Sequence, residues 1–201
     1  MAGAVLACSS MATPAHHDRR QALYDAYCAV PEHKRAEIID GTLYVSPRPA
    51  PRHTNATSVL GGQLNGAFQL GSGGPGGWWI LFEPELHLVS LEPMAPNLAG
   101  WRVERLPVLP ETAFFTLAPN WVCEVLSKST EMRDRMKKLP IFAAHGVSHV
   151  WLIDPLAKTL EVHTLGDDRR WRDVQIFEGS ARVRAEPFEA IEIDLDRLWA
   201  R

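Results

Sequence analysis

Apolar residues recur along the chain with two spacings, and together they predict a mixed α/β fold. Helical spacing predicts three helices, over residues 20–30, 53–70 and 131–145. Short apolar or alternating runs predict strands over residues 37–45, 78–89, 98–103, 121–126, 150–153, 159–164, 171–177 and 181–185. An amphipathic turn follows at residues 195–199. This order predicts a mixed central β-sheet flanked by α-helices.

Turn-forming residues mark several boundaries between these elements. Asp40-Gly41 predicts a tight hairpin within residues 37–45, with the partner strand ending at Pro47, and Gly166-Asp167-Asp168 predicts a second hairpin nearer the C-terminus. Ser129-Thr130 is expected to cap the helix over residues 131–145, and Gly146 is expected to end it.

The length of 201 residues suits one domain, which we place at residues 19–201, after a disordered tail at residues 1–18. No apolar run approaches the roughly 20 residues that cross a bilayer, so no membrane partner is expected. The three cysteines lack paired spacing, which predicts reduced thiols and a cytoplasmic location. Because the net charge is −3, contact with nucleic acid requires a local basic patch.

Two groups of ionisable residues stand out against this background. Glu83, Glu85 and His87 alternate along the predicted strand 78–89 and would share one face, either exposed to solvent or lining a cleft. Glu124 interrupts a very apolar strand, where a carboxylate is costly unless it is paired, protonated or bound to a cation.

The helix that follows Glu124 carries Asp134 and Lys138 at a spacing of four residues. This spacing places both groups on one helix face, where they can form an ordinary surface ion pair. Because the helix begins directly after the strand, its first turns can also bring Lys138 back towards Glu124.

The run VCEVLSKSTEMRDRMKKLPIFAAHGVSHVWLIDP, with AEIIDGTLYVSPRP upstream, resembles the Uma2 family of restriction endonuclease-like proteins, also called DUF820. The resemblance covers roughly residues 20–199. It implies the PD-(D/E)XK nuclease fold, in which acidic residues bind Mg²⁺ or Mn²⁺ to hydrolyse phosphodiester bonds in DNA.

The resemblance also implies a set of site residues. Glu124 corresponds to the strand carboxylate, and the usual lysine two residues later is replaced by Leu126, so Lys138 is the expected migrated lysine. Glu37 resembles the N-terminal active-site glutamate, and His53 matches a histidine at the start of the second helix. Asp134 would offset the charge of Lys138.

The chain departs from the family pattern at Pro96-Asn97, where the pattern reads Pro-Asp. An amide oxygen can ligate Mg²⁺, but it offers a dipole in place of a full charge, so the site is expected to hold the cation less firmly. Glu85, or less favourably Glu83, would be a substitute ligand from the neighbouring strand. The expected metal ligands are therefore Glu37, Asn97, Glu124 and Glu85.

Three functions remain open from the sequence. The first is a metal-dependent endonuclease, and the second is a catalytically degenerate relative that binds nucleic acid or a protein partner without turnover. The third is a structural or assembly module in which Trp78, Trp79, Trp101 and Trp121 form the core or a dimer contact. For the first two, the candidate DNA-facing residues are Arg48, Arg52, Lys128, Arg133, Arg135 and Lys137. Cutting both strands of a duplex would favour a homodimer.

Overall fold

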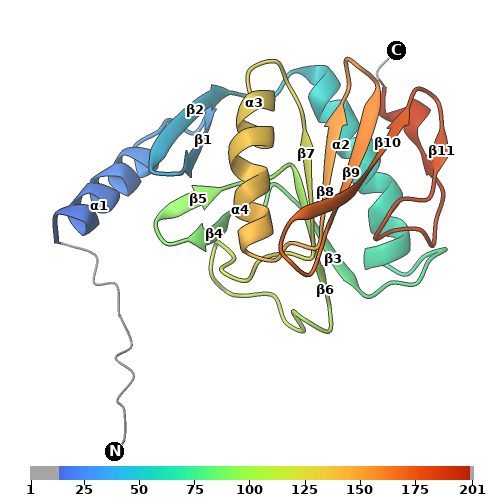
Figure 1. Cartoon of the computed structure of the whole chain (residues 1–201), viewed down its shortest axis with the longest axis horizontal. Helices are drawn as coiled ribbons and strands as arrows, with labels where there is room; N and C mark the ends of the chain where they lie inside the picture. The colour runs from blue at the N-terminus through green and yellow to red at the C-terminus, as the bar shows by residue number, and fades with distance from the viewer. Residues whose placement is uncertain (1–13, 200–201) are drawn as a thin grey trace, which may run out of the picture.

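A six-stranded sheet forms the centre of the molecule (Figure 1). The computed structural model describes residues 14–199, with side chains from residue 17 onward. The strand order is β10 (Trp171–Glu178), β9 (Thr159–Leu165), β8 (His149–Asp154), β7 (Trp121–Val125), β6 (Leu98–Arg102) and β3 (Trp78–Phe82). Strands β7 and β8 are parallel and the other neighbours are antiparallel, which confirms the predicted mixed sheet.

Helices cover both faces of this sheet. Helix α2 (Pro51–Leu64) continues into a π-helical turn, η1 (Asn65–Gln69), and packs on one face. On the other face, α3 (Glu131–Arg133), the π-helical turn η2 (Asp134–Lys138) and α4 (Leu139–Ala144) form one continuous irregular helix. Strand β7 alternates between the two layers: Cys123 joins the core beneath α2, and Val122 joins the core beneath α4. Glu124 therefore shares the face of Val122 and points towards the α3–α4 helix.

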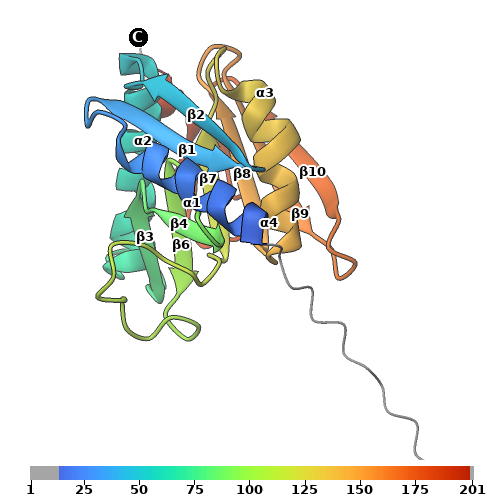
Figure 2. The same ribbon diagram turned by 90° about the vertical axis from the view of Figure 1, so that its left-hand side faces the viewer.

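A smaller lobe stands beside the sheet, built from α1 (Pro14–Cys28) and two hairpins. The first hairpin joins β1 (Lys34–Ile39) to β2 (Thr42–Pro47), and the second joins β4 (Leu86–Val89) to β5 (Glu92–Met94). Figure 2 shows α1 and the β1–β2 hairpin as a separate layer in front of the main sheet. Asp40 and Gly41 both have positive φ, 53° and 65°, as the predicted tight hairpin turn requires.

The C-terminal segment packs against the α2 side of the sheet. Strands β11 (Arg182–Val183) and β12 (Ile193–Asp194) pair, and the 3₁₀ helix η3 (Leu195–Leu198) follows. Asn55 and Gln63 of α2 hydrogen-bond to the backbone of this segment. Phe188 packs against Trp78, Trp121 and Trp151.

The tryptophans singled out by the assembly hypothesis belong mainly to the interior. Trp78, Trp101 and Trp121 are each at most 3 % exposed, and Trp79 is half-buried with its indole N–H bonded to the carbonyl of Leu106. These residues therefore stabilise the chain itself. Within residues 14–199, no helix is long and apolar enough to cross a membrane.

The structure corrects three local predictions. The expected strand 78–89 breaks after Phe82, because Glu83 adopts φ 47° ahead of Pro84, so Glu83, Glu85 and His87 do not line one strand face. Helix α1 begins at Pro14, so residues 14–18 are helical, whereas residues 1–13 of the expected tail lie outside the described part of the chain. Thr130 occupies the N-cap position of α3 without making a side-chain capping hydrogen bond.

Candidate active site

The side chain of Lys138 lies at the centre of three buried carboxylates. Its Nζ is 2.7 Å from Glu37 Oε1, 3.0 Å from Glu124 Oε1 and 3.4 Å from Asp134 Oδ1. All four residues are at most 5 % exposed. The structure thus brings together four predicted site residues from different parts of the chain. It also corrects the expectation of a surface pair, because Asp134 and Lys138 are buried.

Three elements converge to build this cluster. Strand β1 supplies Glu37, strand β7 supplies Glu124, and the π-helical turn η2 supplies both Asp134 and Lys138. In this turn the amide of Leu139 donates to the carbonyl of Asp134, which is the wide hydrogen bond of a π-turn. Pro140 follows immediately and has no amide hydrogen to donate within a regular helix. Asp134 and Lys138 are both buried within this widened turn.

A fifth charge completes the cluster and was not assigned this role from the sequence. Arg133 Nη2 lies 3.3 Å from Glu37 Oε2, and its guanidinium group lies over the Tyr44 ring at 5.1 Å. Three carboxylates therefore face two cations, Lys138 and Arg133. The register of the β1–β2 hairpin explains why Glu37 and Tyr44 lie together. Tyr44 is directly opposite Glu37, and Arg35, two residues before Glu37, lies on the same face.

Burial and the shared lysine separate the two glutamates electrostatically. Burial raises the pKa of Glu124 to about 7, since Asp134 and Glu37 add to the burial effect and Lys138 only partly opposes it. Burial also acts to raise the pKa of Glu37, but Lys138 and Arg133 outweigh it and lower this pKa. Burial opposes the charge on Lys138, yet the three carboxylates raise its pKa overall. Lys138 and Glu37 are therefore charged at neutral pH, and Glu124 is the group that gains or loses a proton near neutral pH.

Asn97 lies in the same cluster and is 2 % exposed. Its Oδ1 accepts a hydrogen bond of 2.8 Å from the backbone amide of Val125, next to Glu124. Its Nδ2 is buried and has no hydrogen-bond partner among the described residues. An unpaired buried amide donor is costly.

The cluster forms the floor of a pocket of about 220 Å³ between the β1–β2 hairpin, the start of α2 and the loop before α3. His53, in the first turn of α2, lines this pocket, as the resemblance implied. Burial, with the nearby charge of Arg35, lowers the pKa of His53, so its imidazole is neutral at neutral pH.

Glu85 is not part of the cluster. Its carboxylate accepts a hydrogen bond of 2.8 Å from the Tyr27 hydroxyl of α1 and lies 2.6 Å from His87 Nε2. Glu83 instead pairs with Arg35 at 3.2 Å. Glu85 therefore holds α1 against β4, and the expectation that it replaces the missing aspartate has no support in this arrangement.

Apart from Arg133, which pairs with Glu37, the predicted DNA-facing residues fall into two groups. Arg52 and Lys128 are exposed, and Arg48 lies at the pocket and donates to the carbonyl of Glu32. Arg135 contacts Glu161 through two nitrogens, at 2.7 and 2.5 Å, and also pairs with Glu131. Lys137 lies 3.3 Å from Asp40. Arg135 and Lys137 thus have carboxylate partners within the chain, which reduces the charge they offer to DNA.

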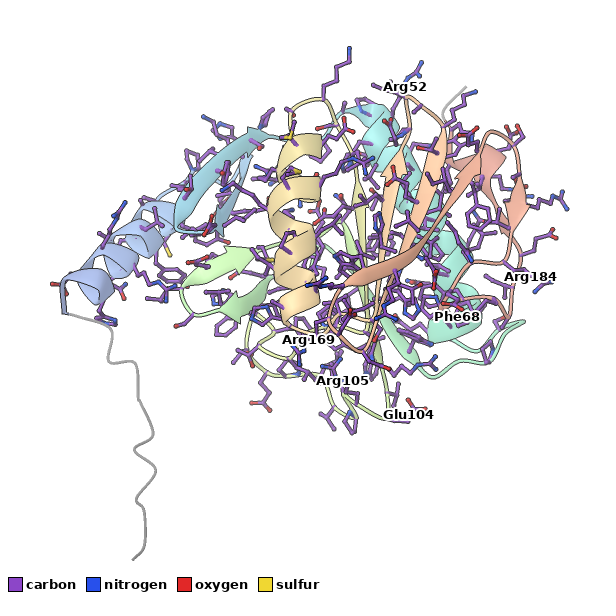
Figure 3. The ribbon with its side chains drawn as sticks, in the orientation of Figure 1. Arg52, Phe68, Glu104, Arg105, Arg169 and Arg184 are labelled. Atoms are coloured by element: carbon purple, nitrogen blue, oxygen red, sulfur yellow. The ribbon has the colours of Figure 1, made fainter. Side chains whose placement is uncertain are left out.

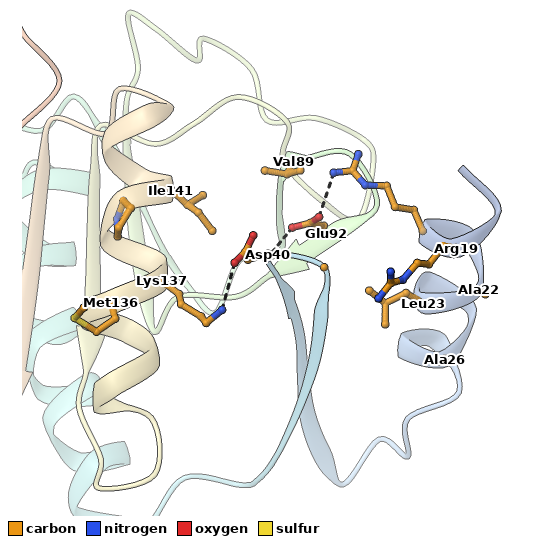
Figure 4. Close-up of a pocket in the computed structure, with 13 residues that line it drawn as sticks. Arg19, Ala22, Leu23, Ala26, Asp40, Val89, Glu92, Met136, Lys137 and Ile141 are labelled. Atoms are coloured by element: carbon orange, nitrogen blue, oxygen red, sulfur yellow. Dashed lines mark hydrogen bonds and ion pairs between the residues drawn. The ribbon is translucent and has the colours of Figure 1, made fainter. Parts of the chain in front are cut away.

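A larger hollow of about 880 Å³ lies between α1 and the α3–α4 helix (Figure 4). Its lining combines small or apolar side chains from the two helices with the ion pairs Lys137–Asp40 and Arg20–Glu92. Asp40 is exposed, and Arg20 and Lys137 are half-buried. None of Glu37, Asn97, Glu124 and Lys138 lines this hollow, so the smaller pocket is the stronger candidate for chemistry.

Comparisons with known proteins identify the fold and the family of the chain. A solved structure described as "Crystal structure of a putative nuclease belonging to DUF820 from Anabaena variabilis ATCC 29413" superposes with a TM-score of 0.70. The match has 20 % sequence identity and covers 88 % of this chain and 96 % of that one, so it shows a shared fold. No curated protein matches the chain. The family model Uma2, described as "Putative restriction endonuclease", matches residues 21–196, and the chain therefore belongs to the Uma2 family.

Proposed function

We propose that this protein is a divalent-cation-dependent endonuclease that hydrolyses phosphodiester bonds in DNA. The observation that carries the proposal is the cluster of Glu37 and Glu124 around the Lys138 ammonium, at 2.7 and 3.0 Å, on the floor of a pocket. Paired carboxylates beside a lysine suit phosphodiester hydrolysis, which needs a cation site and a positive charge near the scissile phosphate. The descriptions of the family and of the structural neighbour as nucleases support the same activity.

The donor set suits Mg²⁺ or Mn²⁺. Within the described residues, no group of three or more His, Cys, Asp or Glu side chains is arranged to hold a metal. Mg²⁺ does not require such a group, because it is usually bound by one or two carboxylates together with substrate phosphate and water. Glu37 and Glu124 supply two carboxylates, and Asn97 Oδ1 keeps a second lone pair beside its bond to Val125. When Glu124 is ionised, three carboxylates face the two cations Lys138 and Arg133, and this excess of negative charge favours a further positive charge.

Each residue then has a chemical role. Glu37 and Glu124 would hold the cation, whose positive charge would polarise the scissile phosphate. Lys138 would stabilise the negative charge that develops on the phosphorane oxygens. The neutral imidazole of His53 would accept a proton from the attacking water. Asp134 would keep Lys138 charged and oriented.

Cleavage of supercoiled plasmid tests this function. Wild-type protein should nick the plasmid with Mg²⁺ or Mn²⁺ and stop when EDTA is added. Glu124→Gln keeps the size of the side chain and removes its charge, so the rate should fall by about a hundredfold. Glu85→Gln is the matched control, because Glu85 lies outside the cluster, and it should cut at the wild-type rate. Equal rates for wild type and Glu124→Gln would reject the proposed site.

One observation favours a second candidate, a degenerate relative that binds without turnover. Asn97 Oδ1 is already bonded to Val125 N–H, and the free end of its amide is a donor. On this account, Asn97→Asp would create plasmid cleavage in an otherwise inert protein. An inert wild type together with an inert Asn97→Asp variant would count against both candidates.

A further inference from the structure

The proposed catalytic groups line a small pocket and are almost fully buried. Glu37, Glu124 and Lys138 are 5, 3 and 2 % exposed, and the pocket is about 220 Å³. The β1–β2 hairpin, the Pro47–Pro49 segment and the loop at Ser129 and Thr130 also line it. A substrate must therefore bring its phosphate into this small pocket to reach these groups.

This depth separates two kinds of nucleic acid. The phosphates of a duplex lie along a stiff stack of base pairs, so a duplex can reach buried groups only if a nucleotide leaves the stack, which costs a few kcal/mol. An unpaired strand can bend its backbone into a pocket without that cost. The volume of the pocket suits a short piece of sugar–phosphate backbone.

Arg133 gives the pocket a means of holding such a phosphate. A guanidinium group has five N–H donors in a planar fork that matches phosphate. The structure gives Arg133 one ion pair, with Glu37 at 3.3 Å, and leaves its side chain 12 % exposed at the pocket. Its guanidinium group lies over the Tyr44 ring, 5.1 Å from the ring centroid.

The charge distribution gives a duplex little to bind. Affinity for a duplex rests on many phosphate contacts with Lys and Arg. The chain carries a net charge of −3, and Arg135 and Lys137 beside the site are paired with Glu161 and Asp40. Of the predicted DNA-facing residues, only Arg48, Arg52 and Lys128 are exposed. A single strand needs fewer phosphate contacts, because stacking on aromatic or guanidinium planes adds to its affinity.

We propose, building on the nuclease function proposed above, that the pocket takes an unpaired DNA strand, with the Arg133 guanidinium on its phosphate. Cleavage is then confined to single strands, flaps and frayed ends. Duplex DNA is a poor ligand and a poor substrate.

Binding is measured with the Glu124→Gln protein, so that nothing is cut. Fluorescence anisotropy compares a labelled thymine-rich single strand with a blunt duplex that contains the same strand. The single strand should bind roughly tenfold tighter or more. Equal binding, tighter binding of the duplex, or no binding of either would overturn the inference.

Cleavage of a splayed-arm DNA by the wild-type protein gives the second readout. Cuts should map to the unpaired arms, and cuts within the paired stem at an equal rate would overturn the inference. If no substrate is cut but the preference for the single strand persists, the proposed hydrolysis fails and the choice of ligand stands.

Substitution of Arg133 tests the phosphate contact. Arg133→Gln should lower single-strand affinity about tenfold, and Arg133→Lys should restore part of it, since a lysine keeps the charge without the fork. Arg184 is the matched control arginine: it is exposed near β11, on the opposite side of the molecule from α1 (Figure 3), and Arg184→Gln should bind as wild type. If folded Arg133→Gln protein binds the single strand as tightly as the protein with Arg133, the proposed contact between Arg133 and the phosphate is wrong.

Discussion

Lys137 and Lys138 are adjacent in the sequence but face two different hollows. Lys138 faces the small pocket, where three carboxylates surround its ammonium and every partner is buried. Lys137 lines the large hollow and pairs with Asp40, whose side chain is 78 % exposed. The ion pair of Lys137 at the larger hollow is therefore weaker than the ion pairs of Lys138 at the smaller pocket. Burial determines how strongly neighbouring charges act on each other, because water screens the exposed pair and not the buried one.

Removal of each lysine should show the largest difference between the two hollows. Lys138→Met leaves Glu37, Glu124 and Asp134 with only Arg133, so we expect the free energy of unfolding to fall by about 3 to 5 kcal/mol. Lys137→Met removes a solvated pair and should change this free energy by about 0.5 kcal/mol or less. Urea unfolding followed by circular dichroism measures both. A Lys138→Met protein with the wild-type midpoint would contradict the account.

The pH dependence of Glu124 should give the next largest effect. Its pKa is about 7 in the folded chain and near 4.5 when unfolded, so the folded state binds more protons between these values. Wild-type stability should therefore decrease as pH rises from about 4.5 to 7, by roughly 1 to 3 kcal/mol in total. Glu124→Gln lacks this loss, so it should be the more stable protein at pH 8 and equal to wild type near pH 4.5. A parallel pair of stability curves would show that Glu124 does not hold the proton.

A third ion pair on the same helix lies between these extremes. Two nitrogens of Arg135 donate hydrogen bonds to the Glu161 carboxylate, and the two side chains are 31 and 15 % exposed. Hydrogen bonds from Arg135 are the main cause of the lowered pKa of Glu161. The stability that Glu161 contributes is therefore present above its unfolded pKa and is lost as pH falls through its folded pKa. Glu161→Gln should cost about 1 kcal/mol at pH 7, discounted for solvent screening. Thermal unfolding at pH 7 and at pH 3 checks this, and the difference from wild type should be smaller at the lower pH.

The sequence predicts the sheet and its flanking helices because their signals are local. The Asp40-Gly41 turn and the apolar run from Trp121 to Leu126 specify their elements without knowledge of the rest of the chain. The break after Phe82 was missed because alternation continues through Glu83, Glu85 and His87, although Pro84 interrupts the backbone pattern.

The site was only partly accessible from the sequence. Glu124 stands out as a charge in an apolar strand, whereas Asp134 and Lys138 have the spacing of any surface pair. They are buried because the helix packs against β7 and the β1–β2 hairpin, and this packing is a property of the assembled fold. Arg133 and Tyr44 join the site for the same reason, through contact with Glu37 and each other.

Binding of Mn²⁺ tests the central claim most directly, because it needs no choice of DNA. Glu124 and Glu161 make a matched pair, since both lie on one face of the sheet at paired positions separated by β8. Isothermal titration calorimetry at pH 8 should show one Mn²⁺ site in the wild type and in Glu161→Gln. The affinity should fall about tenfold or more in Glu124→Gln, and wild-type affinity should weaken below pH 7 as Glu124 gains its proton. Equal Mn²⁺ affinity in all three proteins would contradict the account.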